Sequence, residues 1–274
     1  MRAYPALLLS ALAALTGCLS TRPFSAPSPR LPPRAGAEFR EPVRAGQLVI
    51  HANFHLPAGH RMVSELTSER QLICDRLQIP AGAEPIQVYL FAEEADYRAH
   101  VAAQYPEFPA RRAIFVETDV QLTVYAHWSD RVAEDLRHEV AHGYLHSTVP
   151  NLPLWLDEGL AEYFEVGRGK RGLNRGHLEF LRAQQAAAAW QPDLGRLELL
   201  SDAATMSQGD YAEAWLWVHY LLESPTAPPL LPSYLKGLRA GDPVPTLSSQ
   251  LGQGGPAGPA AQEAIVAHLQ SLAL

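Results

Sequence analysis

The sequence predicts an α+β fold, in which a small mixed sheet with helices is followed by a mainly helical part. Segments in which apolar residues alternate, as in strands, are found within residues 45–128, and apolar residues recur at helical spacing from residue 129 onward. The chain has 274 residues, 47% of them apolar and 8% aromatic, which is enough for a substantial core. Its formal net charge is −7, and because nucleic acids require a basic surface, no nucleic-acid partner is expected.

The first 17 residues are expected to be a signal peptide, because Arg2 precedes an apolar run, residues 7–15, that is too short to span a bilayer. The tetrapeptide Leu15-Thr16-Gly17-Cys18 resembles the lipobox of bacterial lipoproteins. The resemblance implies that Cys18 carries lipid chains and anchors the protein to a membrane of the bacterial cell envelope. Leu19, directly after this cysteine, implies the outer membrane. A plain secretory signal peptide would instead give a secreted protein.

The rest of the chain divides into four segments. Residues 18–44 are expected to form a tether, because prolines at positions 23, 27, 29, 32, 33 and 42 favour an extended backbone. The α/β part covers residues 45–128, with strands at 47–54, 86–91, 113–117 and 121–128 and helices at 57–77 and 93–104. The helical part covers residues 129–242. Residues 243–259 are rich in Pro, Gly and Ser and are expected to be a loop, and the segment 243–274 ends in a helix.

The helix that opens the helical part carries the sequence H-E-x-x-H. Ser129 or Asp130 can cap its N-terminus, and the apolar residues at 132, 136 and 140 form its buried stripe. His138 and His142 lie off this stripe, one turn apart, so that both imidazoles can bind one ion. A zinc ion held in this way would have Glu139 beside its bound water as a general base.

A catalytic zinc ion needs a third protein ligand, and a second helix over residues 152–165 supplies the candidates. Glu158, Glu162 and Glu165 fall on one face of this helix, because they are separated by four and three residues. Glu158 is the predicted ligand. The alternative gives that role to Glu162, with Glu158 in support. Glu165 is expected on a solvated face.

The sequence "HEVAH", followed after fifteen residues by the glutamate of "WLDEGLAEYF", resembles the gluzincin branch of the zinc metallopeptidases, and most of all the secreted bacterial peptidase MA-like proteins. Trp155, Leu156, Glu158 and Gly159 match the family's Trp-Leu-x-Glu-Gly signature. The resemblance is strong over residues 129–166 and diffuse over 45–225. It implies a zincin-like fold, in which the strand before the H-E-x-x-H helix lines the cleft and pairs with an extended substrate. It also implies that Glu162 accepts a hydrogen bond from a ligating histidine.

The expected function is hydrolysis of a peptide or protein substrate with one Zn²⁺ ion. Glu139 would take a proton from the attacking water and pass it to the leaving amine. The Gly-x-Met-Glu-Asn motif of the related aminopeptidases is missing, which favours an endopeptidase. One alternative is a non-catalytic zinc-binding envelope lipoprotein that binds a partner, and intact Glu139 argues against it, because a purely structural site needs no base. The other is a structural anchor that holds no zinc.

Several further residues have an expected role. Gluzincins often supply a tyrosine or histidine from a later helix to the oxyanion, and the candidate is Tyr211, behind an Asp210 cap in the helix at 209–223. The alternative places Tyr211 in the core, because it continues an apolar stripe through residues 215, 218 and 222. His146 is interpreted as a helix-end residue, since the metzincin histidine pattern is absent. The histidines at 51, 55 and 127 are interpreted as structural.

Overall fold

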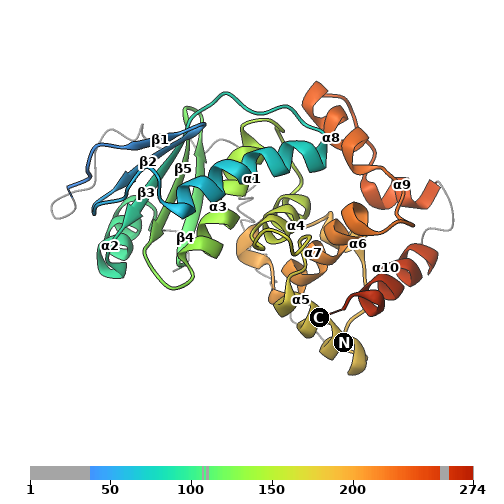
Figure 1. The fold of residues 1–274 in the computed structure, drawn as a ribbon. Helices are drawn as coiled ribbons and strands as arrows, with labels where there is room; N and C mark the ends of the chain where they lie inside the picture. Colours follow the sequence, from blue (N-terminus) through green and yellow to red (C-terminus); the bar gives the residue numbers. More distant parts are fainter. Residues whose placement is uncertain (1–37, 107, 109–110, 254–258, 274) are drawn as a thin grey trace, which may run out of the picture.

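The computed structural model describes residues 38–106, 108, 111–253 and 259–273. The predicted signal peptide, Cys18 and most of the predicted tether lie outside these residues. Figure 1 shows a sheet with its helices, coloured blue to green, beside a helical part coloured yellow to red. Among the described helices, none is long and apolar enough to cross a membrane.

Five strands form one mixed sheet in the order β1-β2-β3-β5-β4. The three central strands, β2 (Leu48–Ala52), β3 (Ile86–Phe91) and β5 (Gln121–His127), run parallel to one another. The two edge strands, β1 (Val43–Ala45) and β4 (Ala113–Thr118), pair antiparallel to their neighbours. Residues 43 and 44, which fall in the predicted tether, therefore belong to the sheet.

The strand with a free edge differs from the one that the resemblance implied. β5 directly precedes the H-E-x-x-H helix, but it pairs with β3 on one side and with β4 on the other, so it has no free edge for a substrate. β4 lies at the end of the sheet and also contacts that helix, α3 (Val132–His146). At this end of the sheet, β4 is therefore the strand to which an extended peptide could add.

Alternation along the strands divides their side chains between two cores. Ile86, Val88 and Leu90 of β3 face the main core, which α1 (Arg61–Leu77) and α3 complete. Tyr89 and Phe91 point to the opposite face and pack with residues of α2 (Glu94–Gln104), such as Tyr97. Successive strand residues point to opposite faces, and each face of this sheet is therefore covered.

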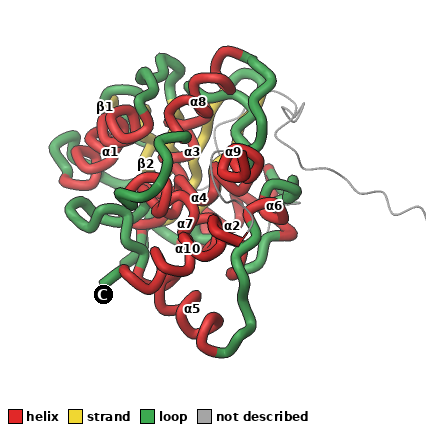
Figure 2. The backbone as a smooth tube through the Cα atoms, turned by 90° about the vertical axis from the view of Figure 1, so that its right-hand side faces the viewer, coloured by secondary structure: helices red, strands yellow, loops and turns green. Residues whose placement is uncertain are grey.

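The helical part is built around α7 (Gln208–Glu223), as the view in Figure 2 shows. This helix contacts α4 (Leu154–Phe164), α5 (Arg175–Ala186), α6 (Leu194–Leu197) and α10 (Pro259–Ser271). A short 3₁₀ helix (Ala203–Thr205), α8 (Leu231–Ala240) and α9 (Leu247–Gln253) complete it. A Cβ atom on Gly159 of α4 would lie 2.6 Å from the carbonyl oxygen of Ala214 in α7. Glycine at this position therefore allows the two helices to approach closely.

Three local expectations differ from the structure. The N-cap of α3 is Arg131, without a side-chain cap hydrogen bond, and not Ser129 or Asp130. α9 lies inside the segment predicted as a loop, where Leu247 is buried and the Ser248 N–H donates to Glu198 Oε1 at 3.0 Å. Ser207, and not Asp210, is the N-cap of α7, and Asp210 is the third residue of a capping box. The predicted α+β architecture is confirmed: a small mixed sheet with helices is followed by a mainly helical part, and the H-E-x-x-H helix stands where the two meet in the sequence.

Candidate metal centre

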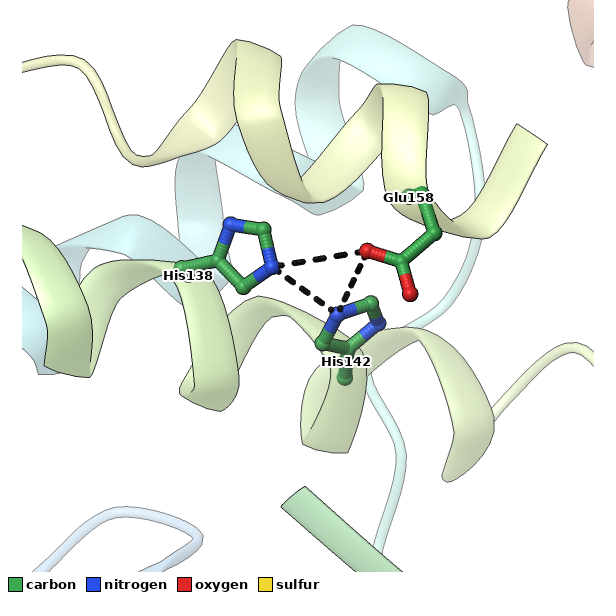
Figure 3. Close-up of side chains that lie close together, drawn as sticks. All are labelled: His138, His142 and Glu158. Carbon is green, nitrogen blue, oxygen red and sulfur yellow. Dashed lines mark hydrogen bonds and ion pairs between the residues drawn. The ribbon is translucent and has the colours of Figure 1, made fainter. Parts of the chain in front are cut away.

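Three side chains from two helices converge on one point (Figure 3). His138 and His142 stand one turn apart on α3, and their Nε2 atoms are 3.3 Å apart. Glu158 of α4 points its Oε2 atom between them, 3.6 Å from His138 Nε2 and 3.7 Å from His142 Nε2. The predicted ligand set is thus brought together by the packing of α4 against α3.

These distances fit a single zinc ion. Ligand atoms that surround a tetrahedral zinc ion at about 2.1 Å lie about 3.4 Å from one another. Glu158 Oε2 is buried and has no hydrogen-bond partner among the described residues, and an unpartnered buried carboxylate oxygen is unfavourable unless a cation binds it. Two imidazoles and one carboxylate are also the donor set of catalytic zinc sites, in which a fourth position stays open for water.

Two carboxylates on α4 and at its end fix the orientation of the imidazoles. His142 Nδ1 lies 2.9 Å from Asp157 Oδ1, and His138 Nδ1 lies 3.0 Å from Glu165 Oε2. A carboxylate accepts hydrogen bonds, so each ring donates its proton from Nδ1. The lone pair of each Nε2 atom is then directed to the point where the three side chains meet.

Glu162 does not make the hydrogen bond that the resemblance implied. Its Oε2 atom accepts from His177 Nε2 at 2.8 Å and from Asn174 Nδ2 at 3.2 Å. Glu165, which was expected on a solvated face, takes the place beside His138, and its side chain is only 15% exposed. The reason is the antiparallel course of α3 and α4, which pairs the end of α4 with the earlier histidine and its start with the later one.

Glu139 lies beside the metal centre, where a general base is needed. It is buried and lines a cavity of about 340 Å³ together with His138 and Glu165. Burial raises the pKa of Glu139, although the neighbouring His138 and His142 oppose this rise. A carboxylate whose pKa is raised by burial is a better proton acceptor for water than a solvated one.

Tyr211 reaches the same region from α7. Its hydroxyl oxygen accepts a hydrogen bond from Arg111 Nη2 at 3.0 Å, and Arg111 lines the cavity that contains Glu139. Burial raises the pKa of Tyr211, and the charge of Glu158 raises it further. The alternative of a core role fits Tyr211 less well than Trp215 and Val218 of the same stripe, because those two are fully buried and Tyr211 is only half-buried.

The remaining histidines lie in different surroundings. His51 Nε2 is 2.9 Å from Gln87 Oε1 within the sheet, and His127 Nδ1 is 3.1 Å from the carbonyl oxygen of Arg112. His55 is exposed. His146 is more than a helix-end residue, because its two ring nitrogens contact Asp157 and Glu117.

Sequence reasoning missed Asp157, Glu165 and Glu117 as partners of the histidines. Asp157 could have been found, because it directly precedes the predicted ligand Glu158 on the same helix. Glu165 could have been preferred over Glu162 only with the relative direction of the two helices in hand. Glu117 could not have been assigned, since its contact with His146 depends on the position of β4 in the sheet.

Comparisons with known proteins found one matching family model and several similar solved structures. A family model described as a protein of unknown function, DUF1570, matches residues 132–234, which include both helices of the metal centre. No curated protein matches the chain.

Among solved structures, three crystal structures of the M1 zinc metallopeptidase from Deinococcus radiodurans are similar to this chain. The structure of a mutant bound to the substrate Tyr-Ser-Ala shares 18% sequence identity with this chain, with a TM-score of 0.46. A second structure of this mutant shares 19% with a TM-score of 0.40, and a structure of the peptidase shares 20% with a TM-score of 0.39. Each match covers 86% of this chain and 52% of the other. The chain thus spans about half the length of these structures, and a likeness at this level assigns it no activity.

Proposed function

We propose that this protein is a zinc-dependent metallopeptidase that hydrolyses peptide bonds within peptides or proteins. The observation that supports the proposal is the convergence of His138 Nε2, His142 Nε2 and the unpartnered Glu158 Oε2 on one point, with Glu139 in the adjoining cavity. His138, His142 and Glu158 would hold one Zn²⁺ ion, which supplies a Lewis acid and lowers the pKa of water.

The residues around the centre have separate roles in the proposed reaction. Glu139 accepts the proton of the attacking water and donates it to the leaving amine. The hydroxyl group of Tyr211 donates to the oxygen on which negative charge develops, while its own oxygen accepts from Arg111. Asp157 and Glu165 keep the two imidazoles in the orientation that binds metal. The free edge of β4 offers backbone groups with which an extended peptide can pair.

The location of the protein is part of the proposal. We infer from the lipobox-like sequence at residues 15–18 that Cys18 carries lipid chains and anchors the protein to the bacterial envelope, in the outer membrane.

Glu139→Gln tests the proposal, because this variant keeps the size and polarity of the side chain and removes the base. We expect zinc content, measured by plasma emission, to stay at the level of the unmutated protein while cleavage of a peptide library is lost. Glu94→Gln on α2 is the matched control: the same chemical change at an exposed carboxylate that pairs with Arg98 should alter neither. An unmutated protein that binds zinc and leaves the whole library intact would favour the alternative, a non-catalytic zinc-binding lipoprotein.

A further inference from the structure

A chain of side chains runs from the edge strand β4 to the metal-binding residue His142. Glu117 Oε2 of β4 lies 2.7 Å from His146 Nδ1, and His146 Nε2 lies 2.9 Å from Asp157 Oδ2. The other oxygen of Asp157 lies 2.9 Å from His142 Nδ1. Asp157 is thus held between two imidazoles, and its exposed fraction is only 7%.

The second imidazole determines how Asp157 can hold the first. A carboxylate bonded through one oxygen can tilt and rotate about that hydrogen bond, and its other oxygen, buried here, would be left without a partner. His146 occupies this second oxygen and so fixes the plane of the carboxylate.

β4 contacts the same two histidines through a second residue. Phe115 and Glu117 are two positions apart and point to the same face of the sheet. The Phe115 ring is stacked on His142, with centroids 5.8 Å apart and planes at 21°, and it meets His146 edge-on at 5.1 Å. The inner face of β4 therefore packs against the metal-binding side of α3, while its outer edge is unpaired in the sheet.

We propose that His146 is a positioning residue for the metal ligand His142, acting through Asp157, and that Glu117 links this pair to the edge strand β4. This inference rests on the proposed function, because it concerns the geometry of a zinc ligand. The link gives β4 a second role, because a peptide that pairs with this strand would also restrain Glu117, the residue that contacts His146. His146 itself needs no contact with zinc or with substrate.

A double-mutant cycle on zinc affinity tests the inference. We expect Asp157→Asn to weaken zinc binding, measured by competition with a chromogenic chelator, by about 10- to 100-fold, and His146→Gln to weaken it by up to about 10-fold. In the Asp157→Asn background, His146→Gln should add little, because the path to His142 is already interrupted. His51→Gln is the matched control, since this half-buried histidine is bonded to Gln87 within the sheet and should leave zinc affinity unchanged.

Two results would overturn the inference. One is a zinc affinity of His146→Gln equal to that of His51→Gln. The other is the same loss from His146→Gln in both backgrounds, which would show that His146 acts independently of Asp157. Thermal unfolding of the metal-free proteins shows whether a fall in zinc affinity comes from a general loss of stability.

Glu117→Gln provides a second variant in case His146→Gln does not fold. The Glu117 side chain is 41% exposed, so the substitution should be tolerated. With Co²⁺ in place of zinc, its visible absorption spectrum should differ from that of the unmutated protein, because ligand orientation changes, and an identical spectrum would count against the link to β4. If the unmutated protein binds no zinc, the proposed function fails; if it binds zinc and cleaves peptides while both variants behave like the control, only the inference fails.

Discussion

Glu165 and Glu162 are one turn apart on the same face of the second helix, and substituting each separates their roles. Glu165 Oε2 accepts the Nδ1 hydrogen of His138 at 3.0 Å, whereas Glu162 is bonded to His177 and Asn174. We therefore expect Glu165→Gln to weaken zinc binding and Glu162→Gln to leave it unchanged. Glu162→Gln should instead lower the free energy of unfolding by about 1 kcal/mol, because a hydrogen bond with a charged partner is weakened.

The size of the effect at Glu165 follows from what each replacement can still do. A glutamine carbonyl oxygen can accept the same hydrogen bond without the charge. Zinc affinity should therefore fall by about 10-fold, or about 1.4 kcal/mol, which is the lower limit for changing the hydrogen-bond partner of a ligating histidine. Glu165→Ala leaves the His138 Nδ1 hydrogen without its partner in a site that is only 13% exposed, so the loss should approach the upper limit of about 100-fold.

Chelator competition gives the zinc affinities, and chemical unfolding of the metal-free proteins gives the stabilities. We expect the zinc affinity to fall in the Glu165 variants. In Glu162→Gln we expect the free energy of unfolding to fall and the zinc affinity to stay unchanged. A loss of zinc affinity in Glu162→Gln that exceeds the loss in Glu165→Gln would refute the assignment and restore Glu162 as the partner of the histidine.

Four further outcomes are expected. Tyr211→Phe should lower kcat by about 100-fold with little change in KM or folding, because it removes one donor to the oxyanion, and steady-state kinetics on a quenched peptide would detect equal activity if Tyr211 only packs. Gly159→Ala should lower the free energy of unfolding by about 1 to 3 kcal/mol and also weaken zinc binding, because the added Cβ would lie 2.6 Å from the backbone oxygen of Ala214. An unchanged free energy of unfolding would contradict the close packing. Burial lowers the pKa of His219 to about 3. The unfolded chain therefore binds more protons than the folded one between about pH 6.5 and 3, and stability is lost as the pH falls through this range. In urea unfolding, His219→Gln should lose less stability than the unmutated protein between about pH 6.5 and 4. Cys18→Ser should move the mature protein from the membrane fraction to the soluble fraction, and unchanged fractionation would speak against lipid anchoring.

The local parts of the fold could be predicted from the sequence, because they depend on spacing along one segment. The second predicted strand shows this well: β3 has the predicted bounds, 86 and 91, because a mainly apolar run lies between Pro85 and the acidic residues at 93 and 94. The pair His138 and His142 is equally local, since the helix alone places the two rings one turn apart. Glu158 required one further assumption, a short connection between two helices.

Features that depend on distant segments could not be predicted in this way. The order β3-β5-β4 leaves β4 at the edge, although β5 is the strand next to α3 in the sequence. α9 forms in a segment of weak helix formers, because Leu247 is buried and Glu198, far away in the sequence, accepts hydrogen bonds from Ser248. In both cases a tertiary contact outweighs the local preference.

The dipeptide Asp157-Glu158 shows how local geometry and packing together build the centre. Consecutive residues on a helix point about 100° apart, so these two carboxylates cannot serve the same atom. Glu158 approaches His142 on its Nε2 side, at 3.7 Å, and Asp157 approaches it on its Nδ1 side, at 2.9 Å. One imidazole is thus bracketed by two neighbouring residues, one placed to bind the metal and the other to orient the ring. Because Asp157 also faces His146, one turn further along α3, the same dipeptide connects the metal ligands to the edge strand of the sheet.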